Sequence, residues 1–233
     1  MSAMRFGFAG LGQMGGPMAA NIVAAGFDLS VFDKAGTAER ASDGAKPLES
    51  LDALVAVVDT LFLSLPDGPV TLAVARDLAA LQDRAVSVVI DLSTIGLEAA
   101  KEAGQILADA GIQYIDAPVS GGIAAANGGT LTFMVGGTDA AFDSARPILS
   151  AMGKAVIHAG GAGNGQAAKI CNNMLLGATM VATCETFAMA RKLGLDPQTF
   201  YDISSVSSGQ SWSMTSYCPV PNVGPQTPAD NGY

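Results

Sequence analysis

Short apolar runs alternate with longer stretches in which apolar residues recur every three or four positions, through the first two thirds of the chain. The short runs predict strands at 5–9, 29–33, 60–65, 85–92, 112–116, 130–136 and 155–158. The periodic stretches predict helices at 14–25, 69–80, 97–110 and 140–152. Because strands and helices alternate, and the run 86–90 is almost continuously apolar, the pattern predicts an α/β fold with a doubly wound, mostly parallel sheet.

A second pattern begins after the glycine-rich segment 160–165. No strand-like run follows, and apolar periodicity predicts one long helix over about 166–193. Asp196 before Pro197 is typical of an N-cap followed by the first helical residue, so a further helix should begin there. We therefore expect an α/β domain at 1–164 and the start of an all-α domain at 165–233.

The apolar stretch 174–184 lies inside the long helix. It is shorter than the ~20 residues that span a bilayer, so we expect a buried helix and no membrane partner. Apolar residues at 174–189 fall on more than one face of this helix. We therefore also expect a homo-oligomer, a dimer or a tetramer, that covers them.

Composition narrows the class of protein further. The chain has 233 residues, of which 49% are hydrophobic and 14% charged, so it can bury a core and should fold. A net charge of −9 argues against a nucleic-acid partner. Cys171, Cys184 and Cys218 form no CxxC pair, which predicts neither a disulfide framework nor a metal site. The first predicted strand begins at residue 5 and leaves no room for a signal sequence, so we expect a cytoplasmic location.

The first motif with chemical meaning is Gly10-Leu11-Gly12-Gln13-Met14-Gly15, between a predicted strand and a predicted helix. This context predicts a Rossmann-type dinucleotide site, with the pyrophosphate at the helix N-terminus. Asp33, at the end of the next strand, can accept hydrogen bonds from the adenosine ribose and would repel a 2′-phosphate, which favours NAD over NADP. Lys34 weakens this preference because it can reach such a phosphate. The alternative is a glycine turn that binds nothing.

Three further segments should lie at the same edge of the sheet, because ligands bind at the carboxyl ends of parallel strands. Leu65-Pro66 and Ser93-Thr94 follow two of the strands, although ordinary turns are equally compatible with these residues. Asp116-Ala117-Pro118-Val119-Ser120-Gly121-Gly122 follows another. Its glycine N–H groups and the Ser120 hydroxyl can form a carboxylate cradle, or the segment can be a plain Pro/Gly loop.

The third motif, Gly165-Gln166-Ala167-Ala168-Lys169-Ile170-Cys171-Asn172-Asn173, opens the long helix. Lys169 and Asn173 are four residues apart and share one helical face. A lysine beside apolar surface loses proton affinity and can act as a general base or acid near neutral pH. The alternative is a lysine at a helix end that extends into solvent.

Together these motifs, with Ser211-Trp212-Ser213 and Tyr217-Cys218-Pro219-Val220-Pro221, resemble the β-hydroxyacid dehydrogenase family over nearly the whole chain. The resemblance implies that Lys169 is catalytic and that the substrate-binding residues are Ser120, Gly121, Gly122, Asn173 and Trp212. It implies that Leu65, Pro66 and Thr94 line the cofactor, beside the glycine motif. Family members continue beyond the segment that matches Tyr233, so we expect the chain to be incomplete.

The activity implied by this resemblance is NAD-dependent oxidation of a small 3-hydroxy acid. The chain is most similar to members that convert 3-hydroxyisobutyrate to methylmalonate semialdehyde, a step of valine breakdown. One alternative is a semialdehyde or glyoxylate reductase of the same family that uses NADPH. Another is a 2-hydroxy-acid dehydrogenase with His158 as its base, although no acidic residue is close to His158 in sequence. A non-catalytic dinucleotide-binding module is the third.

Overall fold

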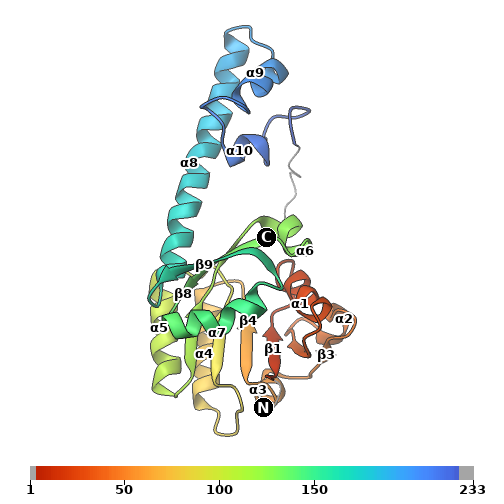
Figure 1. Cartoon of the computed structure of the whole chain (residues 1–233), viewed down its shortest axis with the longest axis vertical. Helices are drawn as coiled ribbons and strands as arrows, with labels where there is room; N and C mark the ends of the chain where they lie inside the picture. Colours follow the sequence, from red (N-terminus) through yellow and green to blue (C-terminus); the bar gives the residue numbers. More distant parts are fainter. Residues whose placement is uncertain (1–3, 226–233) are drawn as a thin grey trace. The chain divides into compact units, whose positions relative to one another are not determined.

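The computed structural model describes residues 4–225 (Figure 1). The chain divides into two compact units, Met1–Lys169 and Ile170–Tyr233.

The first unit is built on one sheet, which has nine strands over the described residues. The strands are β1 (Phe6–Ala9), β2 (Leu29–Phe32), β3 (Lys46–Pro47), β4 (Thr60–Leu63), β5 (Val88–Asp91), β6 (Gln113–Asp116), β7 (Val119–Ser120), β8 (Leu131–Gly136) and β9 (Gly153–Gly160). Their order is β3-β2-β1-β4-β5-β6-β8-β7, and β9 pairs with β8. Neighbours from β3 to β6 are parallel, as are β8 and β9, whereas β8 is antiparallel to β6 and β7. The predicted mostly parallel sheet is confirmed.

Helices cover both faces of this sheet (Figure 1). On one face, α1 (Gly15–Ala24), α6 (Gly122–Asn127) and α7 (Asp139–Leu149) share a core with strand residues such as Phe8, Phe62 and Ile90. On the other, α3 (Leu51–Val55), α4 (Gly68–Ala80) and α5 (Leu97–Asp109) pack on Leu61 and Val89. A four-residue helix, α2 (Thr37–Arg40), follows β2. Successive strand residues thus serve opposite cores, as the pleat requires.

Local sequence signals start several helices. The Asp67 carboxylate accepts a hydrogen bond from Val70 N at 2.9 Å, with proline in the first turn of α4. Asp196 does the same for Thr199 N at 2.9 Å, ahead of Pro197, so the predicted start of the next helix is confirmed. Such caps satisfy N–H groups that have no partner inside the helix.

The second unit consists of the rest of α8 (Asn164–Lys192), which begins in the first unit, with α9 (Pro197–Ser204) and α10 (Trp212–Thr215). Its small core contains Phe187, Met214, Cys218, Val220 and Val223. Phe187 also meets Phe200 of α9 edge-on, with ring centroids 4.9 Å apart. None of the described helices is long and apolar enough for a membrane span.

Every predicted strand and helix is present, with ends shifted by a few residues, whereas the short elements α2, α3, α6, α10, β3 and β7 were not predicted. One expectation is wrong. The stretch 174–184 is helical, but it is not buried: Met174 is 78% exposed, Leu175 66% and Val181 64%. The apolar composition indicates that this segment would gain from burial, but the core of its unit gathers around Phe187, beyond it.

Candidate active site

The parallel strands bring five of the candidate segments to one edge of the sheet. Gly10, Asp33, Leu65, Thr94 and Asp116 lie at or just after the carboxyl ends of β1, β2, β4, β5 and β6. These strands are neighbours in register, so their ends lie side by side. This is the edge at which open α/β sheets bind ligands.

The turn between β1 and α1 has the form of a phosphate cradle. A Cβ at Gly10, where φ is +95°, would lie 2.2 Å from Ser64 O, and a Cβ at Gly15 would lie 1.9 Å from Gly10 O. Both glycines are therefore required by close packing. Gly12 differs, because no protein atom lies within 4 Å of its Cβ position. No acidic residue lies in the first turn of α1 and no side chain caps it, so its N-terminus suits an anion such as a pyrophosphate.

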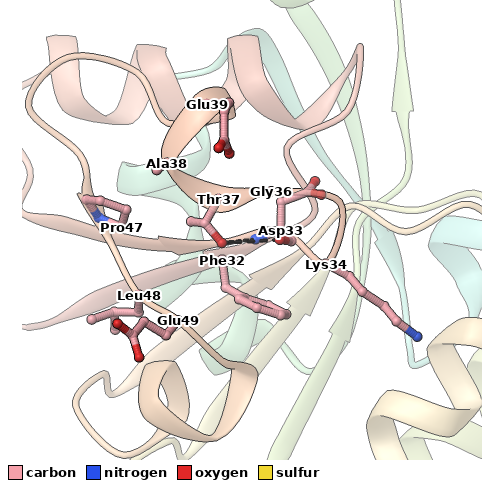
Figure 2. Close-up of a pocket in the computed structure, with 10 residues that line it drawn as sticks. All are labelled: Phe32, Asp33, Lys34, Gly36, Thr37, Ala38, Glu39, Pro47, Leu48 and Glu49. Carbon is pink, nitrogen blue, oxygen red and sulfur yellow. Dashed lines mark hydrogen bonds between the residues drawn. The ribbon is translucent and has the colours of Figure 1, made fainter.

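Asp33 is fixed beside this turn. Its Oδ2 accepts a hydrogen bond from Leu11 N at 2.6 Å, and its Oδ1 accepts one from Ala35 N at 2.8 Å. Asp33 N donates to Thr37 Oγ1 at 3.0 Å, drawn dashed in Figure 2. The carboxylate is thus held at the rim of the glycine turn, with lone pairs left for a ligand hydroxyl.

Asp33 also lines a cleft of about 710 Å³ between the ends of β2 and β3 (Figure 2). Phe32 and Leu48 supply apolar wall, and Glu39 and Glu49 add two more carboxylates. The ammonium of Lys34 points away from the other labelled side chains (Figure 2). Arg40 Nε lies 3.8 Å from Asp33 Oδ1, outside hydrogen-bond distance. The cleft can hold a flat ring and hydroxyl groups, in mostly acidic surroundings.

The loops after β4 and β5 are joined by a hydrogen bond from Leu65 N to Ser93 Oγ, 2.8 Å long. Leu65 is half-buried, while Pro66 and Thr94 are exposed. These two loops therefore present their candidate residues as one connected rim.

Below this rim lie polar groups to which sequence reasoning assigned no individual role. Asp91 is fully buried and accepts hydrogen bonds from Ser93 N and Tyr114 Oη, both at 2.9 Å. Burial is the main cause that raises the pKa of Asp91 to about 6. Burial also raises the pKa of Asp116, which is adjacent to Asp91 on β6. Gln166, at the start of α8, is buried as well. The one sequence feature that could have identified the two buried carboxyls is the position of each at the end of an apolar strand.

The predicted carboxylate cradle has an unusual backbone. Ser120 ends β7, and the next two residues, Gly121 and Gly122, have φ of +138° and +71°. A Cβ at Gly121 would lie 2.5 Å from Ala125 Cβ. Side chains are thus disfavoured at the turn into α6, which leaves bare backbone beside the Ser120 hydroxyl.

Lys169 lies on the second turn of α8 and is half-buried. Burial lowers its pKa below the ordinary value of 10.5. The structure gives its ammonium no ion-pair partner among residues 4–225. A partly dehydrated amine without a counter-charge is suited to exchanging protons.

Asn173 and Trp212 belong to the second unit. Asn173 is exposed, one helical turn after Lys169 on α8. Trp212 opens α10, is 46% exposed and stacks on Tyr217 with centroids 5.0 Å apart.

His158, the rival base, is occupied by structural contacts. Its Nε2 lies 2.8 Å from Gly137 O, its Nδ1 3.3 Å from Asp139 Oδ1, and its ring stacks on Phe142 at 4.8 Å. No acidic residue is close to His158 in the sequence, but the fold places Asp139 beside it. These contacts tie β9 to α7. Nowhere in residues 4–225 do three or more His, Cys, Asp or Glu side chains form a metal-binding group.

Comparison with known proteins agrees with this architecture. Residues 5–161 match the sequence profile of the NAD binding domain of 6-phosphogluconate dehydrogenase. Residues 163–227 match that described as NAD-binding of NADP-dependent 3-hydroxyisobutyrate dehydrogenase.

Individual relatives cover almost all of the chain. The 3-hydroxyisobutyrate dehydrogenase of Pseudomonas aeruginosa is 43% identical, over 97% of this chain and 77% of its own length. The 2-(hydroxymethyl)glutarate dehydrogenase of Eubacterium barkeri is 38% identical, over 91% of this chain and 72% of its own. A solved structure of Mycobacterium tuberculosis 3-hydroxyisobutyrate dehydrogenase with L-serine superposes with a TM-score of 0.89 at 39% identity, covering 98% of this chain and 79% of that one. The chain therefore belongs to the 3-hydroxyisobutyrate dehydrogenase family, a group of oxidoreductases with a Rossmann-like NAD(P)-binding domain.

Proposed function

We propose that the chain oxidises a small 3-hydroxy acid to its aldehyde, with NAD as the second substrate and Lys169 as the group that exchanges the alcohol proton. The observation that carries the proposal is Lys169 itself. It is a partly buried lysine without an ion-pair partner in the described chain, and it lies in the same unit as the dinucleotide turn.

The relatives support a substrate class rather than one compound. 3-Hydroxyisobutyrate, 2-(hydroxymethyl)glutarate and L-serine, named for three similar proteins, share the unit HOCH₂–CH(R)–COO⁻. They differ only in R, which is methyl, carboxyethyl or ammonium. We assign this chain to the class and choose R = methyl first. The product is then methylmalonate semialdehyde, and the reaction is a step of valine breakdown.

In this proposal Lys169 takes the hydroxyl proton as the carbinol carbon is oxidised, and returns it in the reverse direction. Burial lowers its pKa, so a larger fraction of the amine is neutral and able to accept a proton near neutral pH. The nicotinamide ring, when bound, supplies the hydride acceptor. General acid–base groups of this kind contribute about 10²- to 10⁴-fold in rate.

We assign the substrate carboxylate to Ser120, Gly121 and Gly122. The two glycines have positive φ, which supports a backbone cradle next to the serine hydroxyl. Asn173 and Trp212 are assigned to the substrate by the family resemblance. On this assignment residues 1–164 hold the cofactor, and residues 165–233 are the start of the all-α domain.

We assign NAD rather than NADP as the preferred cofactor. Asp33, Glu39 and Glu49 line the cleft beside the glycine turn, and three carboxylates disfavour a 2′-phosphate. Two cations favour the alternative, an NADPH-dependent reductase: Lys34 lines the same cleft, and Arg40 Nε lies 3.8 Å from Asp33 Oδ1. Initial rates with 3-hydroxyisobutyrate and each oxidised cofactor should favour NAD. A preference for NADP would support the reductase instead.

The lysine assignment is tested by Lys169→Ala in the full chain. We expect kcat to fall at least ~100-fold, while the Kd for NAD stays near the wild-type value. Lys192→Ala, at the far end of the same helix, is the matched control and should leave kcat unchanged. Retained turnover in Lys169→Ala would remove this residue from the reaction. NAD binding without turnover of any member of the substrate class by the wild type would indicate a non-catalytic module.

A further inference from the structure

Gln166 makes an unusual set of contacts for a residue at the start of a helix. Its side chain is completely buried. Nε2 donates a hydrogen bond to Ser93 O at 2.8 Å, and Oε1 accepts hydrogen bonds from Ile95 N at 3.1 Å and Gly96 N at 3.2 Å. One amide group thus binds the main chain of the loop after β5 at three points, on both sides of Thr94.

The same loop is linked to the loop after β4. Ser93 Oγ accepts the hydrogen bond from Leu65 N at 2.8 Å. The contacts from Gln166 therefore reach, within two steps, both loops whose residues are assigned to the cofactor.

The main chain of Gln166 is fixed on the opposite side. Asp116 Oδ2 accepts a hydrogen bond from Gln166 N at 2.9 Å, and Asp116 Oδ1 accepts one from Gly163 N at 2.7 Å. A Cβ at Gly165 would lie 2.3 Å from Met134 O, so the first turn of α8 rests directly on the sheet. Lys169 follows three residues after Gln166, one turn along this anchored segment.

We propose that Gln166 is a positioning residue, which holds the Thr94 and Leu65 loops in register with the helical turn that carries Lys169. The inference rests on the proposed function, because it assigns the loops to the cofactor and the lysine to the alcohol. All the groups involved lie in the first unit. Positioning of this kind matters because a displacement of about 1 Å between reacting groups can lower a rate by roughly 10²-fold.

Gln166→Glu is the sharpest test, because it changes one atom of the amide. The introduced carboxyl keeps an acceptor for Ile95 N and Gly96 N. When ionised it turns a second acceptor toward Ser93 O, and when protonated it can donate there again. We expect kcat to fall about 10- to 100-fold at alkaline pH, with KM and the Kd for NAD changed less, and the ratio of variant to wild-type kcat to rise as pH falls. Gln105→Glu, on the exposed surface of α5, is the matched control.

Gln166→Met provides a second variant of similar size that can neither donate nor accept at these three points. It should lose kcat without recovery at low pH. If either variant folds and keeps wild-type kcat at every pH, the proposal is overturned. If neither folds, as judged by thermal unfolding, Gln166 serves stability alone and the proposal also fails. A wild-type chain inactive on every 3-hydroxy acid defeats the proposed function, whereas an active wild type with unaffected variants defeats only this inference.

Discussion

Replacing Asp91 by Asn tests how much the raised pKa of this buried carboxyl changes the stability of the fold with pH. Asp91 ends β5 and is fully buried. Burial is the largest cause that raises its pKa from 3.8 to about 6, while hydrogen bonds from Ser93 and Tyr114 oppose the rise and the charge of Asp116 adds to it. The folded state therefore favours the protonated form of this group.

The consequence for stability has a definite sign. Below pH 3.8 the carboxyl is protonated in both the folded and the unfolded chain, and its contribution is fully present. Between pH 3.8 and about 6 the unfolded chain releases the proton more readily, so the free energy of unfolding falls as pH rises. At about 1.4 kcal/mol for each pKa unit, the loss from this one group is about 3 kcal/mol above that range.

Urea unfolding of the wild type and of Asp91→Asn across this pH range measures the effect. The variant carries an amide that cannot ionise, so the difference in unfolding free energy, wild type minus variant, should fall by about 3 kcal/mol from the acidic to the neutral end. Tyr114→Phe removes a hydrogen bond that lowers the pKa of Asp91. The free energy of unfolding of this variant should therefore continue to fall up to a higher pH than that of the wild type. A difference between wild type and Asp91→Asn that stays constant with pH would refute the reasoning.

Three further predictions concern the cofactor site and the exposed helix. Asp33→Asn should weaken NAD binding by about 10- to 100-fold and NADP binding less, as fluorescence titration can measure, and equal losses for both would contradict the ribose assignment. Gly12→Ala should keep the wild-type melting temperature but lose NAD affinity, and a destabilised Gly12→Ala would count against the phosphate cradle. Gly15→Ala should lose about 1–3 kcal/mol of stability, because the Cβ added at Gly15, unlike the one at Gly12, collides with the backbone. Sedimentation of the wild type should show a dimer or a larger oligomer, and the double substitution Met174→Lys and Leu175→Lys should dissociate that oligomer. A wild-type monomer at micromolar concentration would contradict this prediction.

The main elements of the α/β unit could be predicted because buried parallel strands and their crossover helices leave strong patterns. The strand 88–91 is apolar up to its final carboxyl, and the helix at 97–109 keeps Ala100, Ala103 and Leu107 on one buried face. Helices of four to six residues and strands of two residues carry too little periodicity to be recognised. The strand β3 exists because it pairs with β2, which depends on tertiary structure.

The position of the candidate site also followed from a rule about strand ends, but its internal contacts did not. Gln166 binds a loop some seventy residues earlier in the chain, with |i−j| of 70 to 73. No local pattern specifies such a partner. The apolar side chains of Met174 and Leu175 predicted burial, but both are exposed. Apolar composition indicates that burial would be favourable and does not specify which surface would cover these side chains.

The buried polar groups at this edge of the sheet make several hydrogen bonds each, whereas Lys169 has no ion-pair partner in the described chain. Asp91, Asp116 and Gln166 are buried, and each makes at least two hydrogen bonds of 2.7–3.2 Å. Removing a partner from such a group costs about 1–3 kcal/mol, so these residues resist movement. Lys169 is partly buried, three residues after Gln166 on α8, and the described chain offers its ammonium no ion pair to offset the loss of water. If Lys169 exchanges the alcohol proton as proposed, its change of charge breaks none of the hydrogen bonds that the structure gives to Asp91, Asp116 and Gln166.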